Sequence, residues 1–187
     1  MPDSPAPAPP VRIICVCTAN ICRSPFAHLL LQHRLTAAGV EAEVTSGGTQ
    51  AMTGYGMDAR SREALESRGL AGIPELDTFR ASPLTAERIA AADLVLTATV
   101  EHRDRALRLL PRGLKRTFTL REFAAAAPLV TASSVSELVS GAARRRGEVQ
   151  TPLDIADPVT SDDVTYRAVM AEIDEAVGAI TYAMVPR

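Results

Sequence analysis

The chain has 187 residues and a formal net charge of −2, a length that fits one ordinary domain able to bury its core without disulfides or metals. With 47 % hydrophobic and 22 % charged residues, the composition is typical of a globular chain rather than a disordered one. The acidic balance, an aromatic content of 4 % and the absence of any apolar run of about 18 residues argue against nucleic-acid-binding and membrane-spanning proteins.

The chain begins with a proline-rich tail. Residues 1–10 contain five prolines, so we expect them to be extended and disordered, with the domain occupying residues 11–187. The tail has no basic residue and no apolar stretch, and therefore lacks the features of a signal peptide. The default expectation is a cytoplasmic protein.

After the tail, strand and helix patterns alternate. Val11–Cys17 is a short apolar, β-branched run that predicts a buried strand. Ser24 as a cap and Pro25 in the first turn predict the start of a helix, which Gly39 ends. Further strands are expected at Val40–Thr45, Asp93–Thr97 and Arg116–Leu120, further helices at Asp58–Arg68, Thr85–Ala91, Glu101–Leu110 and Glu122–Ala127, and a turn at Ser46–Thr49.

The C-terminal part contains an expected insertion and a last helix. Residues 128–151 are rich in Ser, Ala and Arg, and a helix is expected within them at Val135–Arg145. Ser161 is expected to cap the last helix, and Asp162 and Asp163 suit the positive end of its dipole. An apolar stripe on that helix predicts its buried face: Val169, Ile173, Ala176, Val177, Ile180 and Met184.

This alternation predicts an α/β fold: a single three-layer domain with a central parallel sheet and helices on both faces. In such sheets, ligands bind at the carboxyl ends of the strands, which is where Cys17 falls.

The three cysteines lie close together in the sequence, at Cys15, Cys17 and Cys22. This clustering favours a reactive cysteine over a structural disulfide framework or a zinc site. Cys17 begins a C-x5-R-S sequence between the first strand and the first helix. Its backbone can curl around one tetrahedral anion, with N–H groups and the positive helix end directed at the anion. Arg23 can then grip two oxygens, and the positive surroundings favour the thiolate of Cys17 as a nucleophile, to which Ser24 can donate. The expected phosphate-binding residues are Thr18, Ala19, Asn20, Ile21, Cys22, Arg23 and Ser24, and with Cys17 we call residues 17–24 the phosphate loop.

Cleavage of a phosphate ester also needs an acid that protonates the leaving group. The best candidate is Asp157, because the Asp157-Pro158 pair gives a stiff turn that can hold a carboxylate over a pocket. The histidines fit this role less well. His28 flanks the stripe of the first helix, His33 faces solvent and His102 lies in a charged run, so each is expected to be structural or solvated.

At these residues the sequence resembles the low-molecular-weight protein tyrosine phosphatase family. The resemblance covers most of residues 11–187 and rests on Val16–Pro25, which has the pattern V-C-x-x-N-I-C-R-S-P, and on the late Asp157-Pro158 pair. Ser46–Thr49 is similar to the family's S-A-G-T turn, and Asp93-Leu-Val-Leu matches its central strand. A nucleophile near the N-terminus with an acid near the C-terminus is specific to this family among cysteine-dependent phosphatases.

The resemblance implies a role for each matching residue. Cys17 would be the nucleophile, Arg23 the phosphate clamp and Asp157 the general acid. Asn20, Ser24 and Ser46 would form the hydrogen-bond network that supports the loop, and Cys22 would form a reversible disulfide with Cys17 under oxidation. No metal or cofactor is required, because the loop amides and Arg23 supply the charge stabilisation.

The sequence departs from the family pattern at two supporting positions. Ala19 stands where the family usually has Gly, so the loop must tolerate a Cβ there. Phe79 falls where the family commonly has His, which would leave the network around Asn20 one member short.

Other departures concern the substrate. Val159 and Thr160 follow Asp157-Pro158 where tyrosine phosphatases of the family carry aromatic residues, and no aromatic occurs between Thr49 and Gly54 on the opposite wall. Tyr55 or Phe79 is the alternative source of an aromatic wall. Ile21 stands where the family's phosphoarginine phosphatases have Thr. The expectation is a protein tyrosine phosphatase with a weakened preference for aryl phosphates.

Three other functions remain open from the sequence. An arsenate reductase using an external thiol is one, although the thioredoxin-coupled version needs further cysteines and none follows Cys22. The others are a phosphatase for a small or non-aromatic phosphate and a non-catalytic phosphate-binding module. Arsenate-dependent thiol consumption and turnover of para-nitrophenyl phosphate separate these possibilities.

The expected partners are phosphorylated proteins or small phosphorylated substrates, and we expect binding to neither nucleic acid nor membranes. The distribution of charge suggests one further partner. The stretch from His102 to Arg121 has seven Arg or Lys residues, against Asp104 within it and Glu101 just before it, which favours a solvated face or a docking patch for an acidic partner.

Overall fold

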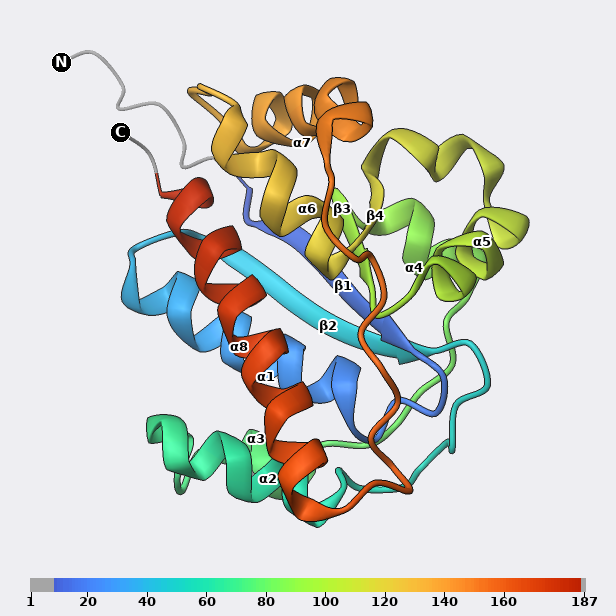
Figure 1. Cartoon of the computed structure of the whole chain (residues 1–187), viewed down its shortest axis with the longest axis vertical. Coiled ribbons are helices and arrows are strands. Elements are labelled where there is room, and N and C mark those ends of the chain that lie inside the picture. The colour runs from blue at the N-terminus through green and yellow to red at the C-terminus, as the bar shows by residue number, and fades with distance from the viewer. Residues whose placement is uncertain (1–8, 186–187) are drawn as a thin grey trace, which may run out of the picture.

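The computed structural model describes residues 9–185, and Figure 1 shows a central sheet enclosed by helices. The sheet has four strands, β1 (Val11–Cys17), β2 (Ala42–Gly48), β3 (Leu94–Thr97) and β4 (Thr117–Thr119), in the order β2-β1-β3-β4. Every neighbouring pair is parallel, which confirms the predicted α/β fold with a parallel sheet. The proline-rich tail lies mostly outside the described residues.

Helices cover both faces of the sheet because both faces of β1 are apolar. Ile13 and Cys15 belong to the larger core, which contains α1 (Arg23–Ala37), α6 (Leu120–Ala126) and α8 (Asp163–Met184). Ile14 and Val16 point the other way, as alternate strand residues must, and pack with α4 (Ala86–Ala91) and α5 (Val100–Leu109). These two cores make the three layers that were predicted.

The strand order places one loop at a special position. From β1 the chain passes through α1 to β2 on one side, and it later returns to β3 on the other side of β1. The carboxyl end of β1 is thus the point where the strand order reverses, and ligands of open parallel sheets bind in the crevice at such points. Cys17 is the last residue of β1 and therefore lies at this point of the sheet.

The remaining elements surround this frame. They are α2 (Ala59–Leu65) with the π-helical turn η1 (Glu66–Leu70), α3 (Glu75–Thr78), α7 (Val135–Arg145) and the 3-10 turns η2 (Pro111–Arg116), η3 (Ala127–Leu129) and η4 (Arg146–Glu148). Within residues 9–185, no helix has both the length and the apolarity needed to cross a membrane.

The segment 128–151 packs against the domain through a buried acidic residue. Its helix α7 has the predicted bounds, whereas the segment's status as an insertion stays a prediction. Glu122, only 2 % exposed, forms ion pairs with Arg146 of η4 and with Arg103 of α5, each at 3.0 Å. Arg146 also stacks over the ring of Phe118 at 4.3 Å. These contacts fix the end of the segment beside β4 and α5.

Three local expectations were wrong. Asp162 rather than Ser161 caps α8, because its carboxylate accepts the N–H of Thr165, while the carbonyl of Ser161 is held by Arg60. Ser24 does not cap α1, which begins at Arg23 without a side-chain cap. Ser46 lies within β2 rather than in a turn, since the parallel ladder with β1 continues to Gly48.

Candidate active site

The phosphate loop presents its N–H groups to an anion because its carbonyls are held on the outside. The partners of these carbonyls lie in residues 49–58, which we call the flanking loop. Backbone N–H groups of Thr49, Gln50, Met52 and Asp58 donate, each at 2.9 Å, to the carbonyls of Cys17, Thr18, Ala19 and Ile21. In the described part of the chain, the backbone N–H groups of residues 18–22 donate to no protein acceptor. Such a row of unpaired amides at a helix start is an anion-binding site.

Two positions explain the curl of the loop. Asn20 has φ of 57° and is, among residues 9–185, the only non-glycine residue with positive φ. Ala19 therefore avoids the left-handed region, and the loop tolerates its Cβ. The position where a side chain cannot fit is Gly48 of β2, which lies directly against the phosphate loop. A Cβ added to Gly48 would lie 2.5 Å from the carbonyl oxygen of Thr18.

The nucleophile sits in the predicted hydrogen-bond network. Sγ of Cys17 lies 3.0 Å from Oγ of Ser24. Asn20 donates to that same Oγ at 2.8 Å and to Oγ of Ser46 at 2.9 Å. Because Ser24 already accepts from Asn20, its own proton is free to be donated to the sulfur of Cys17. The structure thus brings together all three predicted supporting residues, although their roles remain a proposal.

The network is completed by residues that the sequence did not single out. The N–H of Ser82 donates to Oδ1 of Asn20 at 2.9 Å, and Nδ1 of His28 lies 3.3 Å from Oγ of Ser46. Arg88 donates to the carbonyl of Ser46 at 2.7 Å. His28 of α1 thus brings a histidine to Ser46, although Phe79 stands where the family commonly has its histidine. Burial and the charge of Arg88 lower the pKa of His28 to about 4, so its imidazole is neutral at pH 7.

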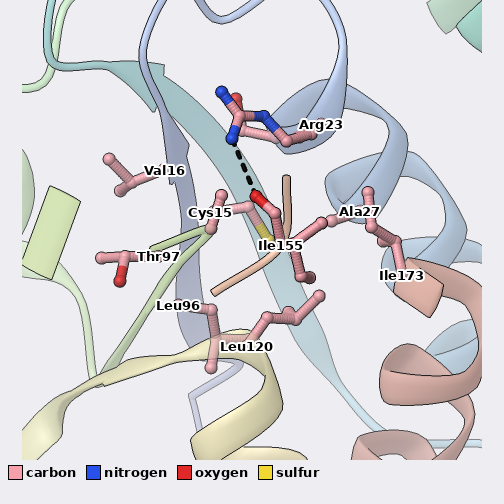
Figure 2. Close-up of a pocket in the computed structure, with 11 residues that line it drawn as sticks. Cys15, Val16, Arg23, Ala27, Leu96, Thr97, Leu120, Ile155 and Ile173 are labelled. Atoms are coloured by element: carbon pink, nitrogen blue, oxygen red, sulfur yellow. Dashed lines mark hydrogen bonds between the residues drawn. The ribbon is translucent and has the colours of Figure 1, made fainter. Parts of the chain in front are cut away.

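Arg23 extends from the end of the phosphate loop across an apolar floor. Figure 2 shows its guanidinium bonded to the carbonyl of Ile155, above the side chains of Cys15 and Leu96. The side chain is only 4 % exposed, and its Nη2 pairs with Oδ2 of Asp157 at 2.5 Å. Nε is buried without a protein partner. Through the edge of the guanidinium that carries Nε and Nη2, an arginine can donate two parallel hydrogen bonds to two phosphate oxygens.

Asp157 lies in an extended segment, residues 154–161, which we call the acid strap. Oδ1 of Asp154 accepts from the N–H of Val100 at 2.7 Å, and the N–H of Ile155 donates to Ala98 at 2.9 Å. Arg60 holds the other end through the carbonyls of Val159 and Ser161. The strap thereby places the carboxylate of Asp157 beside Arg23, a pairing that the sequence did not predict.

The other two cysteines are held as thiols. Burial, with a smaller effect of Cys17, raises the pKa of Cys15 to about 12. Burial also raises the pKa of Cys22 to about 11, although a hydrogen bond with Tyr166 lowers it in part. All three cysteines are buried and unpaired in this structure. Among residues 9–185, no three His, Cys, Asp or Glu side chains are arranged to hold a metal ion.

His102 lies at the phosphate loop, which the sequence interpretation missed. Its Nε2 lies 2.8 Å from Oγ1 of Thr18 and its Nδ1 lies 2.8 Å from Oγ1 of Thr99. The buried side chain agrees with a structural rather than a solvated residue, whereas its contact with the phosphate loop was not expected.

The residues considered for the walls of the pocket differ in how exposed they are. Tyr55 on the flanking loop is 62 % exposed and Val159 on the acid strap is 44 % exposed. Phe79 is half-buried.

Three of the seven Arg and Lys residues in the stretch 102–121 form ion pairs with acidic residues of the described chain. Arg103, Arg105 and Arg121 pair with Glu122, Glu101 and Glu172, and Arg116 donates to backbone carbonyls. These contacts favour the solvated face over a docking patch.

Comparisons with known proteins agree with this geometry. Residues 12–133 match the family described as low molecular weight phosphotyrosine protein phosphatase, a match that includes Cys17 and Arg23 but ends before Asp157. A protein-arginine-phosphatase of Geobacillus stearothermophilus is 32 % identical over 90 % of this chain and 92 % of its own. A low molecular weight protein-tyrosine-phosphatase of Acinetobacter johnsonii is 31 % identical over 58 % of this chain and 71 % of its own.

The fold points the same way. The structure of the YwlE arginine phosphatase from Geobacillus stearothermophilus has a TM-score of 0.69 and 31 % identity, with 92 % of each chain covered. The chain therefore belongs to the low molecular weight phosphotyrosine protein phosphatase family.

Proposed function

We propose that the protein hydrolyses phosphate monoesters on proteins, phosphotyrosine first among them, through a cysteinyl-phosphate intermediate. The observation that carries the proposal is the hydroxyl of Ser24, 3.0 Å from the sulfur of Cys17 and oriented by Asn20 to donate to it. Such a hydrogen bond stabilises a thiolate beneath an anion site made of backbone N–H groups. A non-catalytic phosphate-binding module would not need it.

In the first half-reaction, the thiolate of Cys17 attacks phosphorus and the bond from phosphorus to the leaving oxygen breaks. Asp157 gives its proton to that oxygen, and Arg23 with the loop amides stabilises the charge on the other oxygens. In the second half-reaction, Asp157 as a carboxylate takes a proton from water while the water attacks phosphorus. The S–P bond breaks, and Ser24 donates to the thiolate that leaves.

Before substrate binds, Arg23 and Asp157 hold each other. A phosphate oxygen needs the same Nη2 that Asp157 now occupies, whereas Nε is free. Binding of the phosphate therefore displaces the carboxylate of Asp157 from Nη2 toward the leaving group. Asp157 is 47 % exposed and has room to make this move.

A second substrate, phosphoarginine, is favoured by the protein-arginine-phosphatase that matches nearly the whole chain. Ile21 speaks against it, because the phosphoarginine enzymes resemble each other in having Thr at this position. The weak aromatic surroundings at Val159 still predict only modest discrimination in favour of aryl phosphates.

The test of the proposed function is to trap the intermediate. Acid quenching during turnover of para-nitrophenyl phosphate should leave phosphate on Cys17, located by peptide mass spectrometry. Cys17→Ser should abolish turnover but still bind vanadate, whereas Cys15→Ala should keep most activity. Turnover by Cys17→Ser would overturn the proposal, as would arsenate-dependent thiol consumption without phosphate release. Peptides carrying phosphotyrosine, phosphoarginine or phosphoserine then rank the substrates.

A further inference from the structure

His102 connects α5 to the residue that follows the nucleophile. It occupies the first turn of α5 and is 5 % exposed. Each of its ring nitrogens lies 2.8 Å from a hydroxyl oxygen, Nδ1 from Thr99 on its own helix and Nε2 from Thr18 in the phosphate loop. The ring therefore bridges two segments that are far apart in the sequence.

The start of α5 does not need this ring for its own stability. The hydroxyl of Thr99 already accepts the backbone N–H of His102 at 3.2 Å, and Asp154 accepts the N–H of Val100 at 2.7 Å. The exposed backbone groups of a helix start are satisfied by such contacts. What the imidazole adds is the contact from Nε2 to Thr18.

Burial, together with the charge of Arg23, keeps the ring of His102 neutral. Arg23 and Asp157 face it from the phosphate loop and the acid strap, and Glu101 and Arg105 face it from α5. Burial first, and then the positive charge of Arg23, lower the pKa of His102 to about 4. A neutral ring has one N–H and one lone pair.

A neutral ring can bridge the two hydroxyl groups in either tautomer. When Thr99 donates to Nδ1 of His102, the ring proton lies on Nε2 and is donated to Oγ1 of Thr18. In the other tautomer Nδ1 donates to Oγ1 of Thr99 and Nε2 accepts from Thr18, so both contacts are kept.

We propose that His102 is a positioning residue of the phosphate loop, whose bridge from Thr99 to Thr18 holds the backbone beside Cys17 in its anion-binding conformation. This inference rests on the proposed phosphatase function and deepens it. The carbonyl of Thr18 is fixed by Gln50 on one side, and His102 fixes the side chain on the other. With both held, the N–H groups next to Cys17 face the phosphate without rearrangement.

Two variants of the same residue separate the two ends of the bridge. The amide of Gln reaches about as far as Nε2 of His, whereas the shorter amide of Asn reaches only as far as Nδ1. His102→Gln keeps a donor for Thr18, and His102→Asn keeps only the contact with Thr99. We expect His102→Gln to retain most of the kcat/KM for para-nitrophenyl phosphate and His102→Asn to lose roughly 3- to 10-fold, the usual effect of one neutral hydrogen bond.

Three further measurements distinguish positioning from a general effect on folding. The inhibition constant of inorganic phosphate should rise in His102→Asn by about the same factor as kcat/KM falls, with an unchanged Tm. Thr18→Val should cause the same loss, and combining it with His102→Asn should add little, because both remove one contact. His33→Asn, on the exposed face of α1, is the matched control and should behave like the wild type.

Equal losses in His102→Gln and His102→Asn would overturn the inference, as would full activity in His102→Asn. Additive losses in the double variant, or a lowered Tm with an unchanged phosphate inhibition constant, would also overturn it. None of these results touches the proposed function, which instead fails if the otherwise unchanged Cys17→Ser protein turns over para-nitrophenyl phosphate.

Discussion

The hydroxyl of Ser24 lies between Cys17 and Asn20, and in the proposed mechanism it donates its single proton to the sulfur of Cys17. Because this bond is strongest when the sulfur is a thiolate, it matters most when Cys17 leaves phosphorus. Removing a hydrogen bond to a charged group is worth about 1.5–3 kcal/mol, or roughly 10- to 150-fold in rate. Ser24→Ala should lower kcat within this range, with phosphocysteine accumulating in acid-quenched samples.

The control for this variant is Ser136→Ala, an exposed serine on α7 that should leave kcat unchanged. A loss in Ser24→Ala that appears only in KM, without accumulation of the intermediate, would show that the hydroxyl does not stabilise the leaving thiolate.

Asp157 has two roles in the structure, since it is the proposed acid and also the partner of Arg23. Asp157→Ala should lower kcat by roughly 10²–10⁴ for poor leaving groups and by less for para-nitrophenol, which needs less protonation. Inorganic phosphate should bind at least as tightly, because Arg23 loses the carboxylate that competes for Nη2. Kinetics across a leaving-group series check both points, with Asp104→Ala as the exposed control. Equal losses for all leaving groups would remove Asp157 from the acid role.

At the scale of elements, the phosphate loop contains two cysteines, Cys17 and Cys22, five residues apart. A thiolate at Cys17 is readily oxidised by peroxide to a sulfenic acid, and Cys22 can displace water from it to form a disulfide. We expect peroxide to inactivate the enzyme and dithiothreitol to restore it, with recovery much reduced in Cys22→Ser. Peptide mapping identifies the pair. A disulfide to Cys15 would contradict the assignment.

The contact between β2 and the phosphate loop depends on a missing side chain at Gly48. A methyl group there would lie 2.5 Å from the carbonyl of Thr18, so the loop must shift. Gly48→Ala should cost about 1–3 kcal/mol in the free energy of unfolding, the usual effect of overpacking, and should weaken phosphate binding. Gly56→Ala, which meets no atom within 4 Å, is the matched control. Urea unfolding and phosphate titration measure both, and equal behaviour of the two variants would contradict the close approach.

For the whole molecule, the two buried histidines predict how stability changes with pH. The pKa values of His28 and His102 are lowered to about 4, whereas in the unfolded chain they lie near 6.5. Between these values the unfolded state binds more protons, so stability is complete above about pH 6.5 and falls as the pH drops toward 4. Each histidine contributes up to about 3 kcal/mol to this loss.

Urea unfolding at pH 7 and pH 5 measures the effect. Replacing both histidines, His28→Gln with His102→Gln, should flatten the profile between these pH values, whereas His33→Gln should leave it unchanged. A wild-type stability that does not change between pH 7 and pH 5 would contradict the burial of neutral rings.

The layers of the fold and the ends of its first strand follow from local patterns in the sequence, whereas the second strand was expected at Val40–Thr45 and lies at Ala42–Gly48. The run Val11–Cys17 gave β1 with the same bounds, and the helix at Val135–Arg145 was also placed correctly. Such patterns depend on residues near one another in the chain. The errors lie where a side chain has a distant partner: Ser24 bonds with Cys17 instead of capping its helix, and Arg60 holds the carbonyl of Ser161.

In the candidate site, too, the residues that the sequence indicated lie near one another in the chain. Cys17, Arg23 and Ser24 lie in one short motif, and the Asp157-Pro158 pair indicates the candidate acid. The contacts of His28, Arg88 and His102 with Ser46 and Thr18 were not predicted, because they arise only when the helices fold back onto the sheet. A pattern of single residues carries no information about these distances.

The outward carbonyls of the phosphate loop divide the recognition of a substrate between main chain and side chains. In the proposed site, main-chain amides, which every residue type except proline supplies, face the phosphate, so we expect the shape of the anion site to depend little on the side chains of Ala19 and Ile21. Substitutions at such positions can change which group accompanies the phosphate while the means of holding the phosphate is inherited unchanged. One loop conformation can thus serve relatives that are called arginine phosphatases and others that are called tyrosine phosphatases, and new specificities can arise in this family by small steps that preserve the chemistry.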